Sequence, residues 1–223
     1  MIPWELLGTA PIPNSSGKLS LSRRGEEYSI RVDNAELMNS RMHGSEEELA
    51  RLSCSKIAGR TKAQVLIGGL GMGFTTAAAL ENLPQSARVT VAELVPGLVE
   101  WNRTFLSHLA NEPLSDSRVR VCVEDVGDLM KKSRQKFDAI LLDVDNGPAS
   151  LTHPDNAWLY GPAGLATARR ALRPGGILAV WSVAPDPIFT KRLQQSGFQV
   201  EEVRTCARGK GKGARHTIWL AGI

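Results

Sequence analysis

The sequence predicts an α/β fold, with a mostly parallel, doubly wound sheet covered by helices, a C-terminal antiparallel hairpin and a small N-terminal β element. Three observations support this prediction. From about residue 60 onward, short apolar runs alternate with helical stretches, as in parallel strands joined by crossover helices. From Phe198 onward, two strand-like runs are joined by a loop with no helix between them. The first 40 residues instead hold short stretches of alternating polarity.

The N-terminal residues predict a small β-hairpin element, because KLSLSRR and EYSIRVD both alternate apolar and polar residues. The stretch NAELMNS is predicted to belong to the same element. The stretch GSEEELARLSCSKIAG then predicts a helix that ends at Gly59. Ser45 and Glu48 have the spacing of a capping box at its start. We therefore divide the chain into a β element over residues 1–40 and an α/β domain over residues 41–223.

Five compact aliphatic runs predict the strands of the main sheet: AQVLIG, RVTVAE, RVRVCVE, FDAILLD and GILAVWS. Such runs suit strands that are covered on both faces. Helices are expected in the gaps, over residues 74–82, 96–109, 126–133, 161–172 and 187–196.

Composition excludes several classes of protein. Hydrophobic residues make up 42% of the 223 residues and charged residues 22%, as in ordinary globular domains. No apolar stretch approaches the roughly 20 residues that cross a bilayer, so we expect no membrane span. The first residues lack the pattern of an export signal, and a cytoplasmic location is the expectation.

The 3 cysteines and 4 histidines are scattered, without the spacing of a disulfide framework or a zinc site. We expect buried free thiols and no bound metal. The net charge of +4 is mild, so nucleic-acid binding requires a concentrated patch.

One candidate patch is the stretch ARGKGKGARH, in which cationic residues between positions 208 and 215 alternate with glycine. The basic residues are Arg208, Lys210, Lys212 and Arg215. Such a loop can contact phosphate, but it contains no aromatic residue for base stacking. A solvated hairpin tip is the favoured interpretation, and a nucleic-acid partner is not expected.

Gly68, Gly69, Gly71 and Gly73 follow the first strand of the main sheet and precede a helix that starts at Phe74. A bare strand-to-helix turn offers free backbone N–H groups and the positive end of a helix dipole, and it lets a ligand approach closely. A nucleotide-like ligand fits this description. A tight turn in an ordinary α/β protein has the same pattern and stays open as the alternative.

Two acids follow at the ends of the next strands. Glu93 lies twenty residues beyond Gly73, where a carboxylate can accept both hydroxyls of a ribose. Asp125, followed by Val126, ends the third strand, where it can meet an adenine amino group. A solvated acid and a helix N-cap are the respective alternatives. These residues follow consecutive strands at their carboxyl ends, which is where open α/β sheets bind ligands.

The glycine pattern does not match the dinucleotide fingerprint, whose third glycine would fall at Thr76. A phosphate-binding G-K-[ST] motif is also absent from the sequence. A single nucleoside held by acids, such as S-adenosylmethionine, suits the residues better.

From about Asp33 to Ser182 the sequence resembles the S-adenosyl transferases, most closely the spermidine synthase (polyamine aminopropyltransferase) family. The resemblance lies in VLIGGLGMG, VAELVPGLVEWNR, SRVRVCVEDV, FDAILLDVDNGP and ALRPGGILAVWS. It implies a Rossmann-like, methyltransferase-type domain that binds decarboxylated S-adenosylmethionine, with Glu93 on the ribose, Asp125 near adenine and Asp143 receiving the attacking amine. It also implies a homodimer.

Two departures from the family leave the reaction open. The family's glycine loop carries an aspartate that grips the aminopropyl ammonium, and this chain has Gly71 there. The family has a second acid three residues after the first, whereas Asn146 follows Asp143 here, with Asp145 as a substitute. We therefore place methyl transfer from S-adenosylmethionine to a small, amine-bearing substrate first. Aminopropyl transfer from the decarboxylated donor is the alternative, and a non-catalytic adenosyl-binding module is the second.

Asp143 is the predicted catalytic residue, because a fixed carboxylate stabilises the positive charge that develops on an attacking nitrogen. A structural carboxylate at a strand end is the alternative. The predicted substrate contacts are Asp145, Asn146, Trp158, Tyr160 and His43, with His153, Asp155 and Glu47 as further polar candidates.

Overall fold

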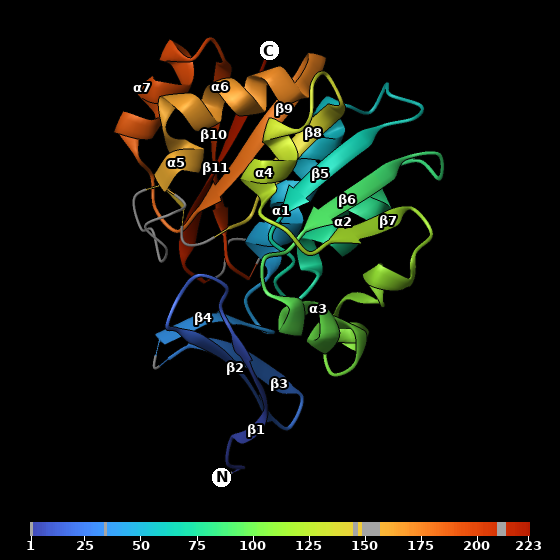
Figure 1. Ribbon diagram of the computed structural model, residues 1–223, viewed down its shortest axis with the longest axis vertical. Coiled ribbons are helices and arrows are strands. Elements are labelled where there is room, and N and C mark those ends of the chain that lie inside the picture. Colours follow the sequence, from blue (N-terminus) through green and yellow to red (C-terminus); the bar gives the residue numbers. More distant parts are fainter. Residues whose placement is uncertain (1, 34, 145–146, 149–156, 209–212) are drawn as a thin grey trace.

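The protein was analysed as a computed structural model, which describes residues 2–33, 35–144, 147–148, 157–208 and 213–223. Figure 1 shows two sheets: a small one formed by the N-terminal residues, and a larger one flanked by helices. The larger sheet has seven strands in the order β10-β11-β9-β8-β5-β6-β7. This order confirms the predicted doubly wound α/β class.

The N-terminal sheet has four antiparallel strands in the order β1-β2-β3-β4. They are β1 Glu5–Pro11, β2 Lys18–Arg24, β3 Glu27–Val32 and β4 Ala35–Asn39. The predicted β element corresponds to β2, β3 and, through the stretch NAELMNS, β4. The prediction missed β1, because its residues, ELLGTAP, show no regular alternation of apolar and polar side chains.

The main sheet contains the predicted strands at nearly the predicted positions. The parallel strands are β5 Gln64–Gly68, β6 Arg88–Ala92, β7 Val119–Cys122, β8 Phe137–Leu142 and β9 Leu172–Ser182. The C-terminal hairpin consists of β10 Gln199–Cys206 and β11 Arg215–Gly222, and β11 pairs antiparallel with β9. The antiparallel tail predicted from the sequence is confirmed.

Helices cover both faces of this sheet (Figure 1). They are α1 Gly44–Lys56, α2 Phe74–Asn82, α3 Pro96–Arg103, α4 Val126–Lys131, α5 Ala157–Tyr160, α6 Pro162–Ala171 and α7 Pro187–Gln195. Side chains of α1 and α2 share one apolar core with the sheet, and those of α4, α5, α6 and α7 share a second. A third core joins the N-terminal sheet to α3.

The helix predicted over residues 96–109 is shorter than expected. It ends at Arg103, and the Leu106 N–H closes the turn by donating to the Trp101 carbonyl at 2.9 Å. Two short 3-10 turns follow, Ser107–Ala110 and Pro113–Ser115. The apolar pattern continued through both turns, so it did not reveal where the helix stops.

The predicted capping box is wrong. Helix α1 starts at Gly44, its N-cap His43 makes no side-chain cap bond, and Glu48 binds Arg51 instead. The Ser45 hydroxyl bonds to Glu46 and to His216, a residue of the distant strand β11. A tertiary partner has replaced the local one.

The thiols are free, but only Cys54 is fully buried, while Cys122 and Cys206 are half-buried. Within the described ranges, no group of three or more His, Cys, Asp or Glu side chains is arranged to hold a metal ion. No helix in this part of the chain is long and apolar enough to cross a membrane.

Candidate active site

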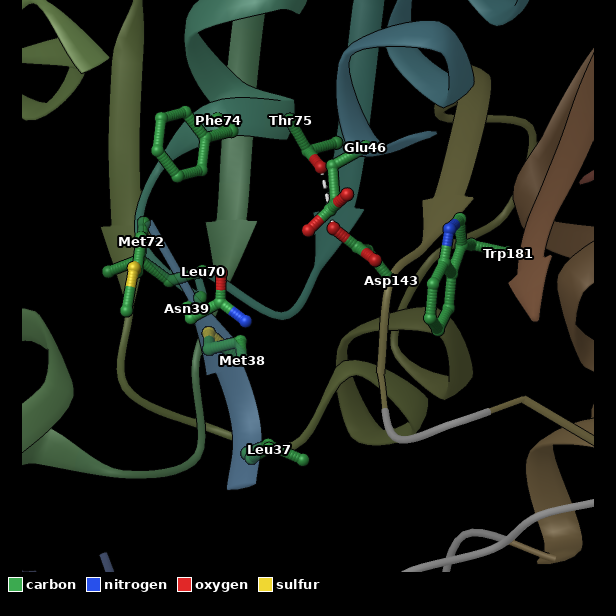
Figure 2. A pocket seen from close by; sticks show the side chains of 11 residues that line it. Leu37, Met38, Asn39, Glu46, Leu70, Met72, Phe74, Thr75, Asp143 and Trp181 are labelled. Atoms are coloured by element: carbon green, nitrogen blue, oxygen red, sulfur yellow. Dashed lines mark hydrogen bonds between the residues drawn. The ribbon is translucent and has the colours of Figure 1, made fainter. Parts of the chain in front are cut away.

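A pocket lies at the carboxyl ends of β5 and β8, where the glycine turn, the start of α1 and strand β4 meet (Figure 2). It encloses about 640 Å³ of empty space, its open mouth included. The pocket is lined by Leu37, Met38, Asn39, Glu46, Leu70, Gly71, Met72, Phe74, Thr75, Asp143 and Trp181.

The glycine turn is held tightly against the neighbouring strand ends. The Gly69 N–H donates to the Ala92 carbonyl, and the Asp143 N–H donates to the Gly68 carbonyl, both at 2.9 Å. Gly69 has φ +88°, and a Cβ there would lie 2.3 Å from the Asp143 carbonyl oxygen. The turn therefore requires glycine at this position, since any side chain would displace the residue that carries the predicted catalytic carboxylate.

Asp143 follows β8 and directs its carboxylate into the pocket (Figure 2). It accepts a hydrogen bond of 2.5 Å from the Thr75 hydroxyl in the first turn of α2. Burial raises the pKa of Asp143 to about 6, and the Thr75 hydrogen bond opposes this shift. The sequence around Thr75 predicts only an ordinary helix. It therefore did not predict that this hydroxyl binds Asp143.

Glu46 lies opposite Asp143, and Figure 2 shows the two carboxylates pointing toward each other. Burial, and next the Asp143 charge, raise the pKa of Glu46 to about 8. Two facing carboxylates in a partly desolvated pocket tend to hold one proton between them. In the sequence, Glu46 is one of three consecutive acids at positions 46–48. The sequence offered no signal that singled it out, because only the packing of α1 brings it to Asp143.

Glu93 ends β6 directly beneath the glycine turn and is almost fully buried, at 7% exposed. Its carboxylate accepts hydrogen bonds from the Leu70 N–H at 3.0 Å and the Val95 N–H at 2.8 Å. Burial raises its pKa. The carboxylate thus links the glycine turn to the start of α3. Its oxygens still have lone pairs that can accept further hydrogen bonds. Its role on a ribose stays a prediction.

Asp125 caps α4 by accepting a hydrogen bond from the Asp128 N–H at 3.1 Å. This is the helix-cap alternative considered for it. Val126 packs against Gly68, where a Cβ would lie 2.8 Å from Val126 Cγ2. The structure therefore brings Asp125 and Val126 to the same rim as the glycine turn, Glu93 and Asp143. An adenine contact by Asp125 stays a prediction.

Three predicted substrate residues lie outside the pocket lining. Tyr160 is only 1% exposed, and its hydroxyl donates to the Val144 carbonyl at 3.0 Å. A substrate contact by Tyr160 stays a prediction. Trp158 packs over Gly127, with Lys131 Nζ 4.5 Å from its ring centroid. His43 bonds to Glu47 and stacks on Phe74, which itself lines the pocket.

Several other candidates lie outside the described residues: Asp145, Asn146, His153, Asp155, Lys210 and Lys212.

Gly73 forms the N-cap of α2 with φ +88°. A Cβ on Gly71 would approach Met38 Sδ at 3.3 Å. Met38 and Asn39 of β4 form part of the pocket wall. They begin the segment MNSRMHGSEEEL, which the resemblance to the family implies lies over the donor and the amine.

The pocket combines apolar walls with one acidic corner. Leu70, Met72, Phe74 and Trp181 supply apolar surface, while Glu46 and Asp143 supply negative charge. Such a site favours a ligand with an apolar body and a cationic group, since a cation between two carboxylates relieves their repulsion. An amine that loses a proton here would find a carboxylate ready to accept it.

Solved structures with a similar fold include two enzymes. The spermidine synthase from Thermotoga maritima matches with a TM-score of 0.75 at 16% identity, over 97% of this chain and 72% of that chain. The O-methyltransferase from Bacillus cereus matches with a TM-score of 0.57 at 18% identity, over 80% of each chain. These TM-scores show a shared Rossmann-like, methyltransferase-type fold.

Curated relatives are named polyamine aminopropyltransferases. The one from Prochlorococcus marinus is 29% identical over 126 residues, which is 56% of this chain and 42% of the relative. The one from Nitrosomonas europaea is 31% identical over 135 residues, which is 58% of this chain and 39% of the relative. The matches thus span about two fifths of these relatives' length. Their names favour the aminopropyl alternative over methyl transfer, which the sequence analysis had placed first.

The match to a protein family covers most of the chain. Residues 42–199 match the Spermine/spermidine synthase domain, a region that includes the glycine turn, Glu93, Asp125 and both pocket carboxylates. This agrees with the resemblance noted in the sequence. The chain belongs to the spermine/spermidine synthase domain family.

Proposed function

We propose that this protein transfers the aminopropyl group of decarboxylated S-adenosylmethionine to a small amine. Membership of the spermine/spermidine synthase family and the names of the curated relatives support this reaction. The observation that carries the proposal is the acidic corner formed by Glu46 and Asp143 in an otherwise largely apolar pocket. A homodimer is part of the proposal by resemblance to the family.

The acidic corner discriminates between the two donors. S-adenosylmethionine carries a carboxylate on its amino-acid end, whereas the decarboxylated form ends in an ammonium alone. A like charge about 4 Å from a carboxylate costs roughly 1 kcal/mol in water and about 4 kcal/mol near a protein surface. Since about 1.4 kcal/mol is a tenfold change in affinity, we expect the decarboxylated donor to bind roughly 5- to several-hundred-fold more tightly.

Glu46 also compensates for Gly71, the position at which the family's glycine loop carries an aspartate. A side chain at this position would run against Met38, since even a Cβ lies 3.3 Å from its sulfur. Glu46 approaches the same pocket from α1 and supplies a carboxylate there. We propose that Glu46 binds the aminopropyl ammonium in place of the family's loop aspartate. The glycine turn, Glu93 and Asp125 with Val126 are proposed to hold the adenosyl part.

Asp143 is the proposed acceptor for the nucleophile's proton. The acceptor amine must lose a proton before its nitrogen attacks the carbon bonded to the sulfonium. The C–N bond then forms as the C–S bond breaks, sulfur keeps the electron pair, and the nitrogen becomes a secondary ammonium. Positive charge therefore moves from sulfur to nitrogen, and the nearby carboxylates stabilise it.

The test is a titration and a product assay with both donors. The protein is titrated calorimetrically with each donor, then incubated with each donor and a panel of short diamines, and products are identified by mass spectrometry. We expect tighter binding of the decarboxylated donor, an aminopropylated amine as product, and loss of the donor preference in Glu46→Gln. A matched control is Glu26→Gln, an exposed residue of the N-terminal sheet region.

Two results would contradict the proposal. A methylated product with no donor preference supports the methyl transfer placed first in the sequence analysis. Tight binding of either donor without any product supports the adenosyl-binding module instead.

A further inference from the structure

A chain of hydrogen bonds leads out of the acidic corner on the side of α1. The Ser45 hydroxyl lies 2.9 Å from Glu46 Oε2 and 2.8 Å from His216 Nδ1. Ser45 is fully buried at 0% exposed, while His216 on β11 is half-buried. The chain therefore starts at a pocket carboxyl, passes through a buried hydroxyl and ends at a group that water can reach.

The imidazole of His216 is held in place by its neighbours. It packs edge-on against Trp181, with ring centroids 4.8 Å apart and an interplanar angle of 76°. Trp181 itself lines the pocket. Burial lowers the pKa of His216, so the ring is neutral at physiological pH and has one bare nitrogen.

A buried serine between two titratable groups supports two proton arrangements. When Glu46 is ionised, Ser45 donates to the carboxylate and His216 Nδ1–H donates to Ser45. When Glu46 is protonated, its proton is donated to the Ser45 oxygen, and Ser45 donates to a bare Nδ1. The position of the imidazole proton is therefore coupled to the charge on Glu46.

We infer that Ser45 and His216 form a relay that carries the proton released by the acceptor amine from Glu46 to solvent. This inference rests on the proposed function, because aminopropyl transfer to an ammonium substrate releases one proton per turnover. Neither Ser45 nor His216 touches a reacting atom. Both act through Glu46.

The proton balance of the relay is simple. Asp143 accepts the amine's proton, which then passes to Glu46, the member of the carboxylate pair with the higher pKa. It moves to the Ser45 oxygen as Ser45's own proton moves to His216 Nδ1, and the imidazolium formed gives its Nε2 proton to water. Glu46 is then ionised again, and the imidazole regains its starting tautomer by exchanging protons with solvent.

Within the described part of the site, no other charged group is placed to take the proton from Glu46 in place of Ser45. The other carboxyl groups that act on Glu46 are Asp143 across the pocket and Glu47 on the same helix. Glu47 is exposed and bonds to His43. Burial lowers the pKa of His216, and its ring contacts Ser45 and Trp181.

The first test does not depend on turnover. Two-bond ¹H–¹⁵N NMR spectra of the histidine rings report which nitrogen carries the proton, and His216→Gln assigns the His216 signal. As pH rises through the titration of Glu46, we expect the neutral His216 ring to switch from the Nε2–H to the Nδ1–H tautomer. Ser45→Ala and Glu46→Gln should abolish the switch, while Ser55→Ala, on the exposed side of α1, should leave it unchanged.

A fixed tautomer in the wild type, or a switch that persists in Ser45→Ala, overturns the relay whether or not the protein proves to be an aminopropyltransferase. The two proposals therefore fail separately.

The second test uses the reaction. Ser45→Ala and His216→Gln should lower kcat by roughly 10- to 100-fold with little change in KM, since loss of a positioned proton acceptor typically costs 10²–10⁴ and water partly replaces it. The solvent deuterium isotope effect on kcat should rise above the wild-type value. His108→Gln, at an exposed histidine far from the relay, is the control. An active enzyme in which both variants keep the wild-type kcat, pH profile and isotope effect would refute the relay and leave the proposed function intact.

Discussion

Glu46 and Asp143 concentrate the chemistry of this pocket in two side chains. They come from different elements, one from the first turn of α1 and one from the end of β8, and both line the same small volume. Each raises the cost of ionising the other, so the pair is poised to bind a cation or to take up a proton. Two predictions follow from this property.

Replacing Asp143 with asparagine should lower turnover by about 10²–10⁴, because the pocket loses the carboxylate proposed to accept the amine proton. Donor affinity should change far less, since the glycine turn and Glu93 remain. Steady-state kinetics and calorimetric titration measure the two quantities. Asp128→Asn, at an exposed position where the carboxylate pairs with Lys131, is the matched control. Unchanged turnover in Asp143→Asn would mean that Asp143 is a structural carboxylate at the end of a strand.

The acid pair also predicts an opposite dependence of binding and stability on pH. The pKa of Glu46 rises from 4.5 to about 8, and that of Asp143 from 3.8 to about 6. Between the unfolded and folded pKa values the folded state holds more protons, so stability falls as pH rises from about 4.5 to about 8. Affinity for a cationic donor should rise over the upper part of the same window, as the pair ionises.

Thermal unfolding and donor titration at a series of pH values test this prediction. In Glu46→Gln the loss of stability between pH 5 and pH 8 should be smaller than in the wild type, and the pH dependence of donor affinity should flatten. A wild type that becomes more stable relative to Glu46→Gln as pH rises would show that Glu46 ionises readily in the fold.

At the scale of elements, the turn between β5 and α2 positions the site. It carries Gly69 against the backbone of Asp143, and Glu93 holds it from below through the Leu70 N–H. After β8, the Tyr160 hydroxyl donates to the Val144 carbonyl, so α5 restrains the chain just after the proposed catalytic carboxylate. The position of Asp143 in the acidic corner thus depends on backbone contacts of the neighbouring elements.

Replacing Gly69 with alanine should destabilise the protein by roughly 2–5 kcal/mol, because left-handed backbone strain adds to a clash with the Asp143 carbonyl. Turnover should fall as well, since relief of the clash displaces Asp143. Gly59→Ala is the control, because a Cβ there has nothing within 4 Å. Chemical denaturation and kinetics of both variants provide the comparison. Equal stability of the two variants would show that the turn tolerates a side chain.

At the scale of the whole molecule, a buried carboxylate links the strands at the end of the sheet opposite the pocket. Asp138 on β8 has a side chain only 1% exposed, and it accepts hydrogen bonds from the Gln64 N–H at 2.7 Å and from Arg173 at 2.8 Å. Arg60 lies 3.7 Å from its other oxygen. One side chain thereby links β5, β8 and β9 away from the chemistry.

Replacing Asp138 with alanine should cost about 1–3 kcal/mol of stability, because it leaves the Gln64 N–H without its partner. For a domain of this size each kcal/mol lowers Tm by roughly 2–4 °C. Donor affinity and turnover, measured well below Tm, should stay at the wild-type level. The control is Asp128→Ala, whose exposed ion pair contributes at most about 1 kcal/mol. A large loss of donor affinity in a folded Asp138→Ala protein would mean that the two ends of the sheet are coupled.

The sequence by itself determined the features that depend on local pattern and on general rules of sheet folds. Alternating apolar runs and helical stretches predicted the parallel strands and the antiparallel tail. Because parallel strands present their carboxyl ends along one edge, the sequence also placed the glycine turn, Glu93, Asp125 and Asp143 at a common rim. The division of the chain near residue 40 stays a prediction.

Tertiary packing alone decided the rest. Glu46 faces Asp143 only because α1 packs beside the sheet, and Ser45 meets His216 across 171 positions of sequence. The same packing buried Tyr160 and turned Ser45 away from its predicted cap. Local periodicity cannot encode such contacts, because they arise where separate elements bury their apolar faces against one another, and that fit depends on the chain as a whole.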